Sequence, residues 1–277
     1  MQPKLRVLLL ACIVPSMFAC AVIDDIRDVV ETVDEAITLL QQLDESGTWD
    51  YVSDGVDGLI DQENGYLATV RFDHTQTGFA DDSFTVELEV DGDNDAWATV
   101  FRNGDPTRYF IDAPPENVGE SHVYRRNPQG SYDCVTSAGG DDTLERLLRN
   151  GIDSIFNDYS DVAVGVQLLS VANEVDETTI AGRAVTHYEI ESKIDDALDI
   201  LRRFDNEELE AKIEEAGDFE VGGDLYIDNE TSALLMFTST YHSTRTTERV
   251  TLRFEVTQWG GVANIEPPEV ANACPVR

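Results

Sequence analysis

Histidine is the side chain best suited to acid–base or metal chemistry near neutral pH. The chain has four, without an HExxH pattern or a pair at metal-binding spacing: His74, His122, His187 and His242. No G-x-S-x-G, G-x-x-x-x-G-K or C-x-x-C motif occurs. Among 55 acidic residues, no carboxylate pair can be singled out as catalytic. The sequence therefore predicts no catalytic residue, no metal site and no cofactor, and it favours a protein that is not an enzyme.

Two short motifs resemble ligand or modification sites, and we interpret both as turns. "DGDND" (residues 91–95) has aspartates at alternating positions, as calcium loops do. An EF-hand loop also needs Gly at its sixth and Glu at its twelfth position, where this chain has Ala96 and Arg102. "NET" (residues 229–231) matches a glycosylation sequon but lies between two predicted strands, where a turn is expected.

Cys20 is the residue whose context predicts a defined chemistry. Lys4 and Arg6 lie at the start of the chain, and residues 5–14 form an almost purely apolar run. Pro15 and Ser16 break this run, and small Ala19 directly precedes the cysteine. That order is typical of a bacterial lipoprotein signal, in which the cysteine thiol takes a diacylglyceryl group. The residues before the cysteine, "MFA", depart from the usual pattern of Leu, Ala or Ser, then Gly or Ala. We predict a signal peptide over residues 1–19 and a lipid anchor at Cys20.

Two alternatives for this segment stay open. Ala19-Cys20-Ala21 also fits an A-x-A cleavage site, which would mean ordinary secretion without lipid. Residues 7–23 could instead remain as an anchor, at the lower limit of membrane-spanning length. All three interpretations export the chain, so we expect a protein of the bacterial cell envelope, attached to a membrane through its N-terminal lipid.

The net charge limits the partners. Removing residues 1–19 removes Lys4 and Arg6 and no acid, so the formal net charge goes from −36 to −38. Such a surface repels nucleic acid and anionic head groups. Solubility in a salty medium explains the excess of acids, because salt screens charges over about 8 to 10 Å. Binding of divalent cations is the alternative, which the even spread of the acids disfavours.

Two further cysteines, Cys134 and Cys274, follow Cys20 in the exported part of the chain. An oxidising compartment favours a single disulfide between them, and two free thiols are the alternative. In the chain-entropy account, closing so long a loop stabilises the fold by about 4 to 5 kcal/mol.

Hydrophobic periodicity divides the remainder into helices and strands. Apolar residues at helical spacing over residues 22–43 predict an amphipathic helix, and a weaker helix or turn follows over residues 51–61. The period then becomes two: "SFTVELEVD" and "RVTLRFEVTQW" alternate as antiparallel strands with one solvated face do. Helical patterns return over residues 142–156 and 195–217. We predict one α+β domain over residues 20–277.

The closing strands carry a family resemblance. "TIAGRAVTHYEIES" (residues 179–192), "DLYIDNETSALLMFTSTY" (224–241) and "VTLRFEVTQWGGVANIEPP" (250–268) are similar to strands of the LolA/LolB-like lipoprotein-carrier superfamily, in particular lipoproteins of the LppX and LprG type. The earlier half matches only in the order of its elements. The resemblance implies a strongly curved antiparallel β-sheet, a half-open barrel, with helices covering its inner face. It also implies binding of lipid or lipoprotein acyl chains.

A carrier of this kind needs no chemical motif, because an acyl chain offers only CH2 groups and its site needs only apolar lining. The inward residues of the predicted strands, which include one over residues 162–171, are the candidate lining. Ordinary core packing is the alternative for each of them. They are Phe84, Val86, Leu88, Val166, Leu168, Tyr188, Ile190, Leu225, Ile227, Leu252 and Phe254.

We therefore expect an envelope lipoprotein that binds acyl chains in an apolar cavity and transports them across the envelope. The second hypothesis is a structural or interaction lipoprotein of the same fold, with a filled core and no ligand. An enzyme is the third, and would need a cleft with converging polar groups.

Overall fold

The structure is a computed structural model that describes residues 26–78, 81–102, 106–113, 121–135, 144, 148, 170–193, 195–196, 199–200, 219–243 and 247–274. Cys20, Val166 and Leu168 lie outside these residues. The same holds for the signal segment and for most of the helical stretches predicted over residues 142–156 and 195–217.

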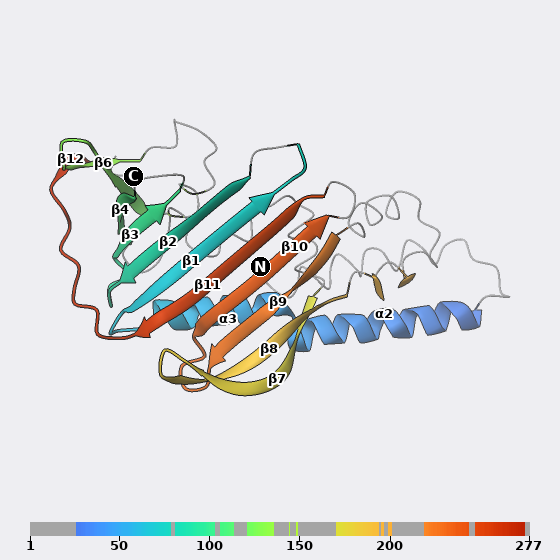
Figure 1. The fold of residues 1–277 in the computed structure, drawn as a ribbon. Helices are drawn as coiled ribbons and strands as arrows, with labels where there is room; N and C mark the ends of the chain where they lie inside the picture. Colours follow the sequence, from blue (N-terminus) through green and yellow to red (C-terminus); the bar gives the residue numbers. More distant parts are fainter. Residues whose placement is uncertain are drawn as a thin grey trace.

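The described strands form one twelve-stranded sheet (Figure 1). Its order is β12-β6-β5-β4-β3-β2-β1-β11-β10-β9-β8-β7, and every neighbouring pair is antiparallel except β12 with β6. The strands are β1 (Tyr66–Thr75), β2 (Asp82–Val90), β3 (Ala96–Phe101), β4 (Thr107–Asp112), β5 (His122–Arg126), β6 (Tyr132–Cys134), β7 (Ser170–Ile180), β8 (Arg183–Ser192), β9 (Phe219–Asp228), β10 (Leu234–Ser243), β11 (Arg249–Trp259) and β12 (Val270–Asn272).

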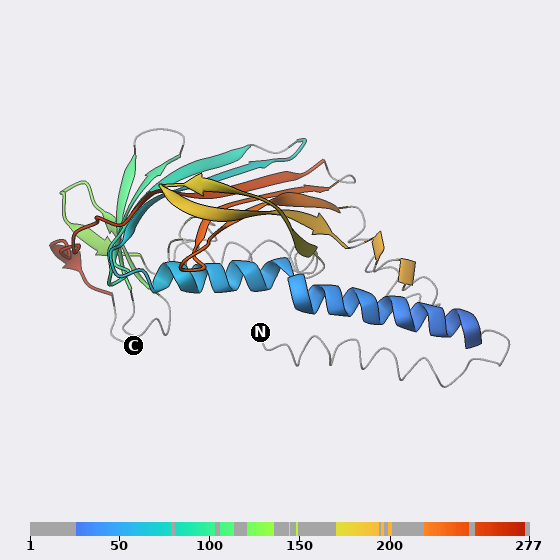
Figure 2. The same ribbon diagram turned by 90° about the horizontal axis from the view of Figure 1, so that it is seen from below.

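Two helices precede the sheet. α2 (Ile26–Ser46) and α3 (Thr48–Ile60) meet at Gly47, which forms an isolated antiparallel bridge with Val171 of β7. Figure 2 shows the sheet bowed over α3, whereas α2 runs on past the end of the sheet. The predicted α+β class, with a curved antiparallel sheet and helices on its inner face, is confirmed.

The alternation of side chains in the central strands explains why they form a sheet with two unlike faces. In β1, Val70 is paired with Val86 of β2 on one side and with Phe254 of β11 on the other, and all three side chains are buried. One residue along, Arg71 is paired with Arg253 and points to the opposite, solvated face, where both are exposed. We call these the inner and the outer face; a shift of register by one residue would exchange them.

Residues 162–169 of the strand predicted over residues 162–171 lie outside the described residues. Its last two residues, Ser170 and Val171, belong to β7, which continues beyond the prediction to Ile180. β7 is the edge of the described sheet, where the residues between Asn173 and Thr179 are exposed and carry three acids. Charged edge strands lack the apolar alternation by which interior strands are recognised.

The C-terminal segment, which contains Pro267 and Pro268, adds a strand to the sheet. We call residues 260–274 the C-terminal strap: they run along one end of the sheet and add β12 beside β6 (Figure 1). The Tyr132 N–H donates to the Glu269 carbonyl (3.1 Å), and the Asn272 side-chain amide donates to Asp133 (2.6 Å). The strap therefore extends the sheet by a parallel strand.

Candidate functional site: the inner face of the sheet

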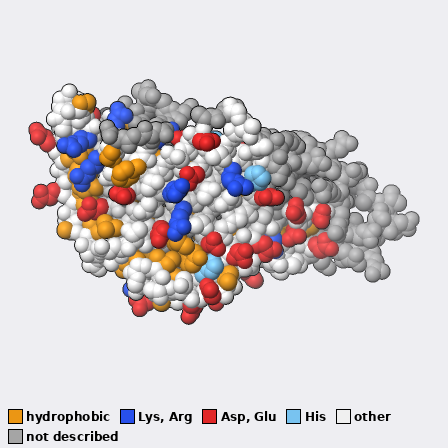
Figure 3. All heavy atoms as spheres, viewed as in Figure 1, with side chains coloured by type: hydrophobic (Ala, Val, Ile, Leu, Met, Phe, Trp, Pro, Cys, Tyr) orange, Lys and Arg blue, Asp and Glu red, His pale blue; other side chains and the backbone are white. Residues whose placement is uncertain are grey.

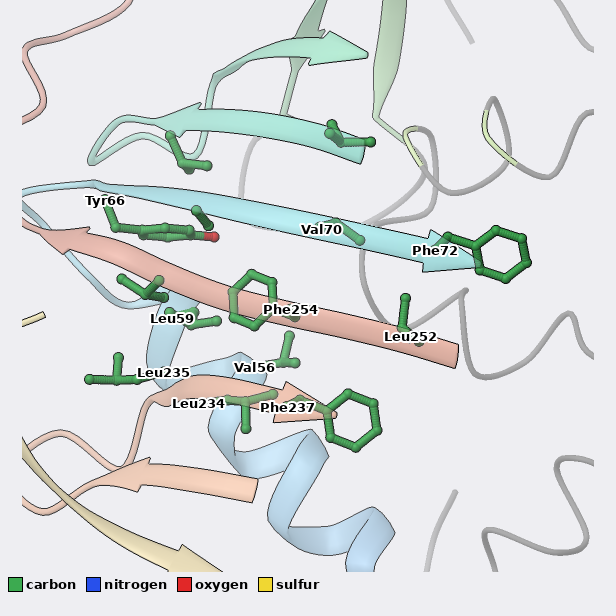
Figure 4. Close-up of a cluster of buried hydrophobic side chains, with 14 of the residues drawn as sticks. Val56, Leu59, Tyr66, Val70, Phe72, Leu234, Leu235, Phe237, Leu252 and Phe254 are labelled. Carbon is green, nitrogen blue, oxygen red and sulfur yellow. The ribbon is translucent and has the colours of Figure 1, made fainter. Parts of the chain in front are cut away.

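The inner face is a continuous apolar surface from β5 to β8, and the same cluster includes the buried Leu144 and Leu148. The helix α3 packs against β10 and β7. Val52, Val56 and Leu59 lie on one side of α3 at spacings of four and three residues, and their side chains are 2 to 7% exposed. Figure 4 shows Val56 and Leu59 among side chains of β1, β10 and β11. The helix thus buries its whole apolar stripe against the sheet.

Two glycines allow α3 to approach the sheet closely. A Cβ atom at Gly55 would lie 2.8 Å from the Leu234 Cβ, and one at Gly58 would lie 2.8 Å from the Ala233 Cα. Ala233 and Leu234, where β10 begins, are both fully buried. Glycine weakens a helix interior, so its presence twice in one face of α3 marks a place where packing decides the residue. The disulfide that the structure describes, Cys134–Cys274, does not involve α3.

Nine of the eleven predicted lining residues belong to this one cluster. Six of them are buried: Phe84, Val86, Ile190, Leu225, Leu252 and Phe254. The other three, Leu88, Tyr188 and Ile227, are partly buried and pack against the same cluster. Val166 and Leu168 lie outside the described residues. Whether these side chains contact a ligand stays a prediction.

The prediction missed α3 as a lining element. Val52, Val56 and Leu59 have the spacing of a helix stripe, but Gly55 and Gly58 between them lower its helical propensity. The sequence signal for this helix was a pair of glycines, Gly55 and Gly58, on the side that also carries the apolar stripe. Recognising it requires knowing that another chain segment lies against that side.

The inner face becomes more polar at its β7–β8 end. Tyr51 of α3 contacts Tyr188 of β8, with ring centroids 4.7 Å apart. Burial, together with the nearby Tyr51 and Glu174, raises the pKa of Tyr188, so its hydroxyl stays protonated at neutral pH. The adjacent Thr48, the first residue of α3, is 5% exposed. This end, where α2 leaves the sheet, is the rim of the inner face.

The outer face carries charge networks instead (Figure 3). The His187 Nδ1 lies 3.0 Å from an oxygen of Asp176, its Nε2 lies 2.9 Å from an oxygen of Asp224, and its ring stacks on Tyr226 at 4.4 Å between centroids. Burial of the ring disfavours the charged imidazolium, but the hydrogen bonds and charges of the two carboxylates outweigh this, so the pKa of His187 is raised. These contacts join β7, β8 and β9.

A second ion pair stabilises the turn between β9 and β10. Asp228 is 2% exposed and accepts two hydrogen bonds from the Arg183 guanidinium (both 2.8 Å) as well as the backbone N–H of Thr231 (2.8 Å). Burial opposes ionisation of Asp228, but these hydrogen bonds prevail and lower its pKa to about 2. The "NET" motif forms part of this turn, as predicted, with the Glu230 N–H donating to Asp228 (3.0 Å).

A separate apolar cluster lies on the outer face, at the β3–β6 end. It consists of aromatic side chains that stack on one another, with Trp97 and Phe110 at 5.2 Å and Trp97 and Tyr132 at 5.4 Å between centroids. We call it the outer aromatic cluster; its buried members are Phe110, Tyr124, Tyr132 and Ile265. Ile265 comes from the C-terminal strap, whose Cys274 forms a disulfide with Cys134 across 140 residues of sequence.

The "DGDND" turn also forms a hydrogen bond with the C-terminal strap. Asp91 is 2% exposed, and its carboxylate accepts hydrogen bonds from the backbone N–H groups of Asp93 (2.9 Å), Asp95 (3.1 Å) and Ile265 (2.6 Å). The motif therefore forms a hairpin turn, as predicted, and its Asp91 also binds a distant segment of the chain.

Within the described part of the chain, no group of three His, Cys, Asp or Glu side chains is arranged to hold a metal ion. None of the helices described there has the length and apolar character of a membrane span.

Comparisons with known proteins give similarity at the level of fold. No protein-family model and no curated protein sequence matches the chain. Among solved structures, a LolA superfamily protein from Nitrosomonas europaea is similar over 79% of this chain and 95% of its own, at 7% identity and a TM-score of 0.32. LprF from Mycobacterium bovis is similar over 81% and 99%, at 11% identity and a TM-score of 0.32.

The complex of MucA and MucB from Pseudomonas aeruginosa is a further match, at 15% identity and a TM-score of 0.29. It covers 75% of this chain, which spans about half (56%) of the matched chain. The structural neighbours thus include the LolA superfamily, which the closing strands of the sequence resemble. At these scores the likeness concerns the fold alone.

Proposed function

We propose that this chain is a non-enzymatic, lipid-anchored protein of the bacterial envelope that binds acyl chains of lipids or lipoproteins between the sheet and α3. The observation that supports this most is the cover of the inner face. Part of a continuous apolar surface is covered by a short helix, α3, whose apolar stripe packs on the sheet. An acyl chain can replace such a helix, because both offer the sheet the same apolar contact.

The free energy gained by burying an acyl chain is sufficient for binding. Each CH2 group taken from water contributes about 0.8 kcal/mol, so about ten buried groups correspond to a micromolar dissociation constant. Val86, Leu225 and Phe254 are 0% exposed, so α3 and its neighbours fill the inner face when no ligand is bound. Binding therefore requires that α3 moves away from part of the sheet.

The same full burial favours a second candidate function, a structural or interaction lipoprotein whose core is permanently filled. Native mass spectrometry of protein purified without detergent separates the two. Carriage predicts masses above that of the polypeptide by the mass of one or more lipids. The bare polypeptide mass in every preparation, also after incubation with lipid vesicles, would favour the filled core.

A matched pair of variants tests where the ligand lies. Leu88 and Leu67 are both half-buried and lie in neighbouring strands, the first on the inner and the second on the outer face. We expect Leu88→Trp to weaken binding of a fluorescent acyl lipid several-fold and Leu67→Trp to leave it unchanged. Equal effects would contradict an inner-face site.

A separate variant tests the lipid anchor. If Cys20 carries the lipid, Cys20→Ala should move the protein from the membrane fraction to the soluble fraction.

A further inference from the structure

The first turn of α3 contains a buried hydroxyl without a hydrogen-bond partner. Thr48 is 5% exposed, and among the described residues its Oγ1 is the buried side-chain oxygen or nitrogen with no partner in the protein. Leaving a buried hydroxyl unsatisfied costs free energy. Valine has nearly the same shape and would avoid this cost, so folding alone does not account for threonine at this position.

The hydroxyl belongs to a turn that is already suited to a hydrogen-bond acceptor. Gly47 is the N-cap residue of α3, and no side chain caps the first N–H groups of the helix. The positive end of a helix dipole attracts an oxygen that carries negative partial charge. The Thr48 O–H therefore adds a side-chain donor to a helix end that no side chain caps.

The position of this turn connects it with the inner face. Gly47 bridges Val171 of β7, and Tyr51, one turn after Thr48, contacts Tyr188 of β8. Thr48 thus lies at the rim, where α2 leaves the sheet (Figure 2), and the apolar stripe of α3 begins at Val52. A ligand with its polar end at Thr48 would place its apolar end along that stripe.

We propose that the first turn of α3, with the Thr48 hydroxyl as donor, binds the carbonyl oxygen of an esterified acyl ligand at the rim. The inference rests on the proposed function and adds to it the chemical class of the ligand. The carbonyl of an ester is neutral and accepts hydrogen bonds, which suits the donors of this turn.

The charges around the rim select the ester over a free carboxylate. Asp50 lies in the first turn of α3, and Glu174 is close enough to Tyr188 to raise its pKa. Lys193, at the end of β8, is engaged by Glu191 (2.6 Å) and Asp196 (3.8 Å). These carboxylates would repel a fatty-acid carboxylate, whereas they would not repel the neutral carbonyl of an ester.

The experiment compares Thr48→Val with the wild type, using a long-chain monoacylglycerol and the fatty acid of the same chain length as probes. Thr69→Val is the matched control, since Thr69 is half-buried on the outer face of β1. We expect Thr48→Val to raise the Tm of the ligand-free protein by about 2 to 4 °C and to weaken monoacylglycerol binding about fivefold to tenfold. The wild type should bind the fatty acid more weakly than the ester, and less so at high salt.

The outcomes separate the two proposals. If the wild type binds neither probe, the proposed function is wrong and the ligand class with it. If it binds the ester and Thr48→Val binds it equally well, acyl binding stands and the role of Thr48 is overturned. A lower Tm in Thr48→Val would also overturn it, because the hydroxyl would then stabilise the fold through a partner within the protein.

Discussion

The two apolar clusters of this sheet are covered in different ways. The inner face is covered by α3, which buries a stripe of side chains and is held by packing. The outer aromatic cluster is covered by the C-terminal strap, which contributes one buried side chain, Ile265, and is fixed by the Cys134–Cys274 disulfide. An extended strap with so little apolar surface needs a covalent bond, whereas a helix with a full stripe does not. We therefore expect the inner cover to separate from the sheet more readily than the outer one.

The largest expected effect comes from the inner cluster itself. Phe254 is fully buried in the central strand β11, so Phe254→Ala should lower the free energy of unfolding by about 3 to 5 kcal/mol. The neighbouring Arg253→Ala, on the outer face, should change it by less than about 0.5 kcal/mol. Urea denaturation measures both. Similar losses for the two variants would contradict the assignment of the faces.

Removing the disulfide tests the outer cover. Cys134→Ser combined with Cys274→Ser should cost about 2 to 4 kcal/mol. Hydrogen exchange should accelerate in the C-terminal strap and in β6, while peptides from α3 keep their protection. Faster exchange in α3 as well would mean that the two covers are coupled through the sheet and not independent.

The close contact between α3 and the sheet is tested by adding a single methyl group. Gly58→Ala would bring a Cβ within 2.8 Å of the Ala233 backbone, and we expect a loss of about 1 to 3 kcal/mol. Gly222→Ala, in β9, meets nothing within 4 Å and is the control. If Gly58→Ala is as stable as its control, α3 does not lie as close to β10 as its packing indicates.

The smallest effect is a pH dependence at the β7 edge. The folded-state pKa of His187 is raised above its value of about 6.5 in an unfolded chain. Its contribution to stability is therefore fully present below that value and is lost as pH rises through the folded pKa. The difference in unfolding free energy between the wild type and His187→Gln should shrink as pH rises from 6 towards alkaline values.

A His187 resonance that titrates at or below the value of a free imidazole, in an NMR titration, would contradict the ion-pair cluster.

Strand alternation made part of this fold predictable. In "SFTVELEVD" and "RVTLRFEVTQW" every second residue is apolar, because the strand period of two assigns these residues to one face whichever strands become its neighbours. The inward set from β2, β9 and β11 is correctly placed for this reason. The continuation of β7 from Ala172 to Ile180 was not predicted, because an edge strand has no such constraint. The helix α3 was underrated because Gly55 and Gly58 are explained only by the segment that packs on them.

The amino-acid sequence by itself determined the class of the fold, the two unlike faces of the sheet and the pattern of the export signal, since each of these depends on residues close together in the chain. The disulfide between Cys134 and Cys274 was predicted from the count of cysteines, and the structure confirms it. Only the tertiary structure decided which segment covers which face. The parallel strand β12 and the unsatisfied Thr48 hydroxyl depend on segments far apart in sequence. Local periodicity carries no information on such contacts, because they arise from the packing of the whole chain.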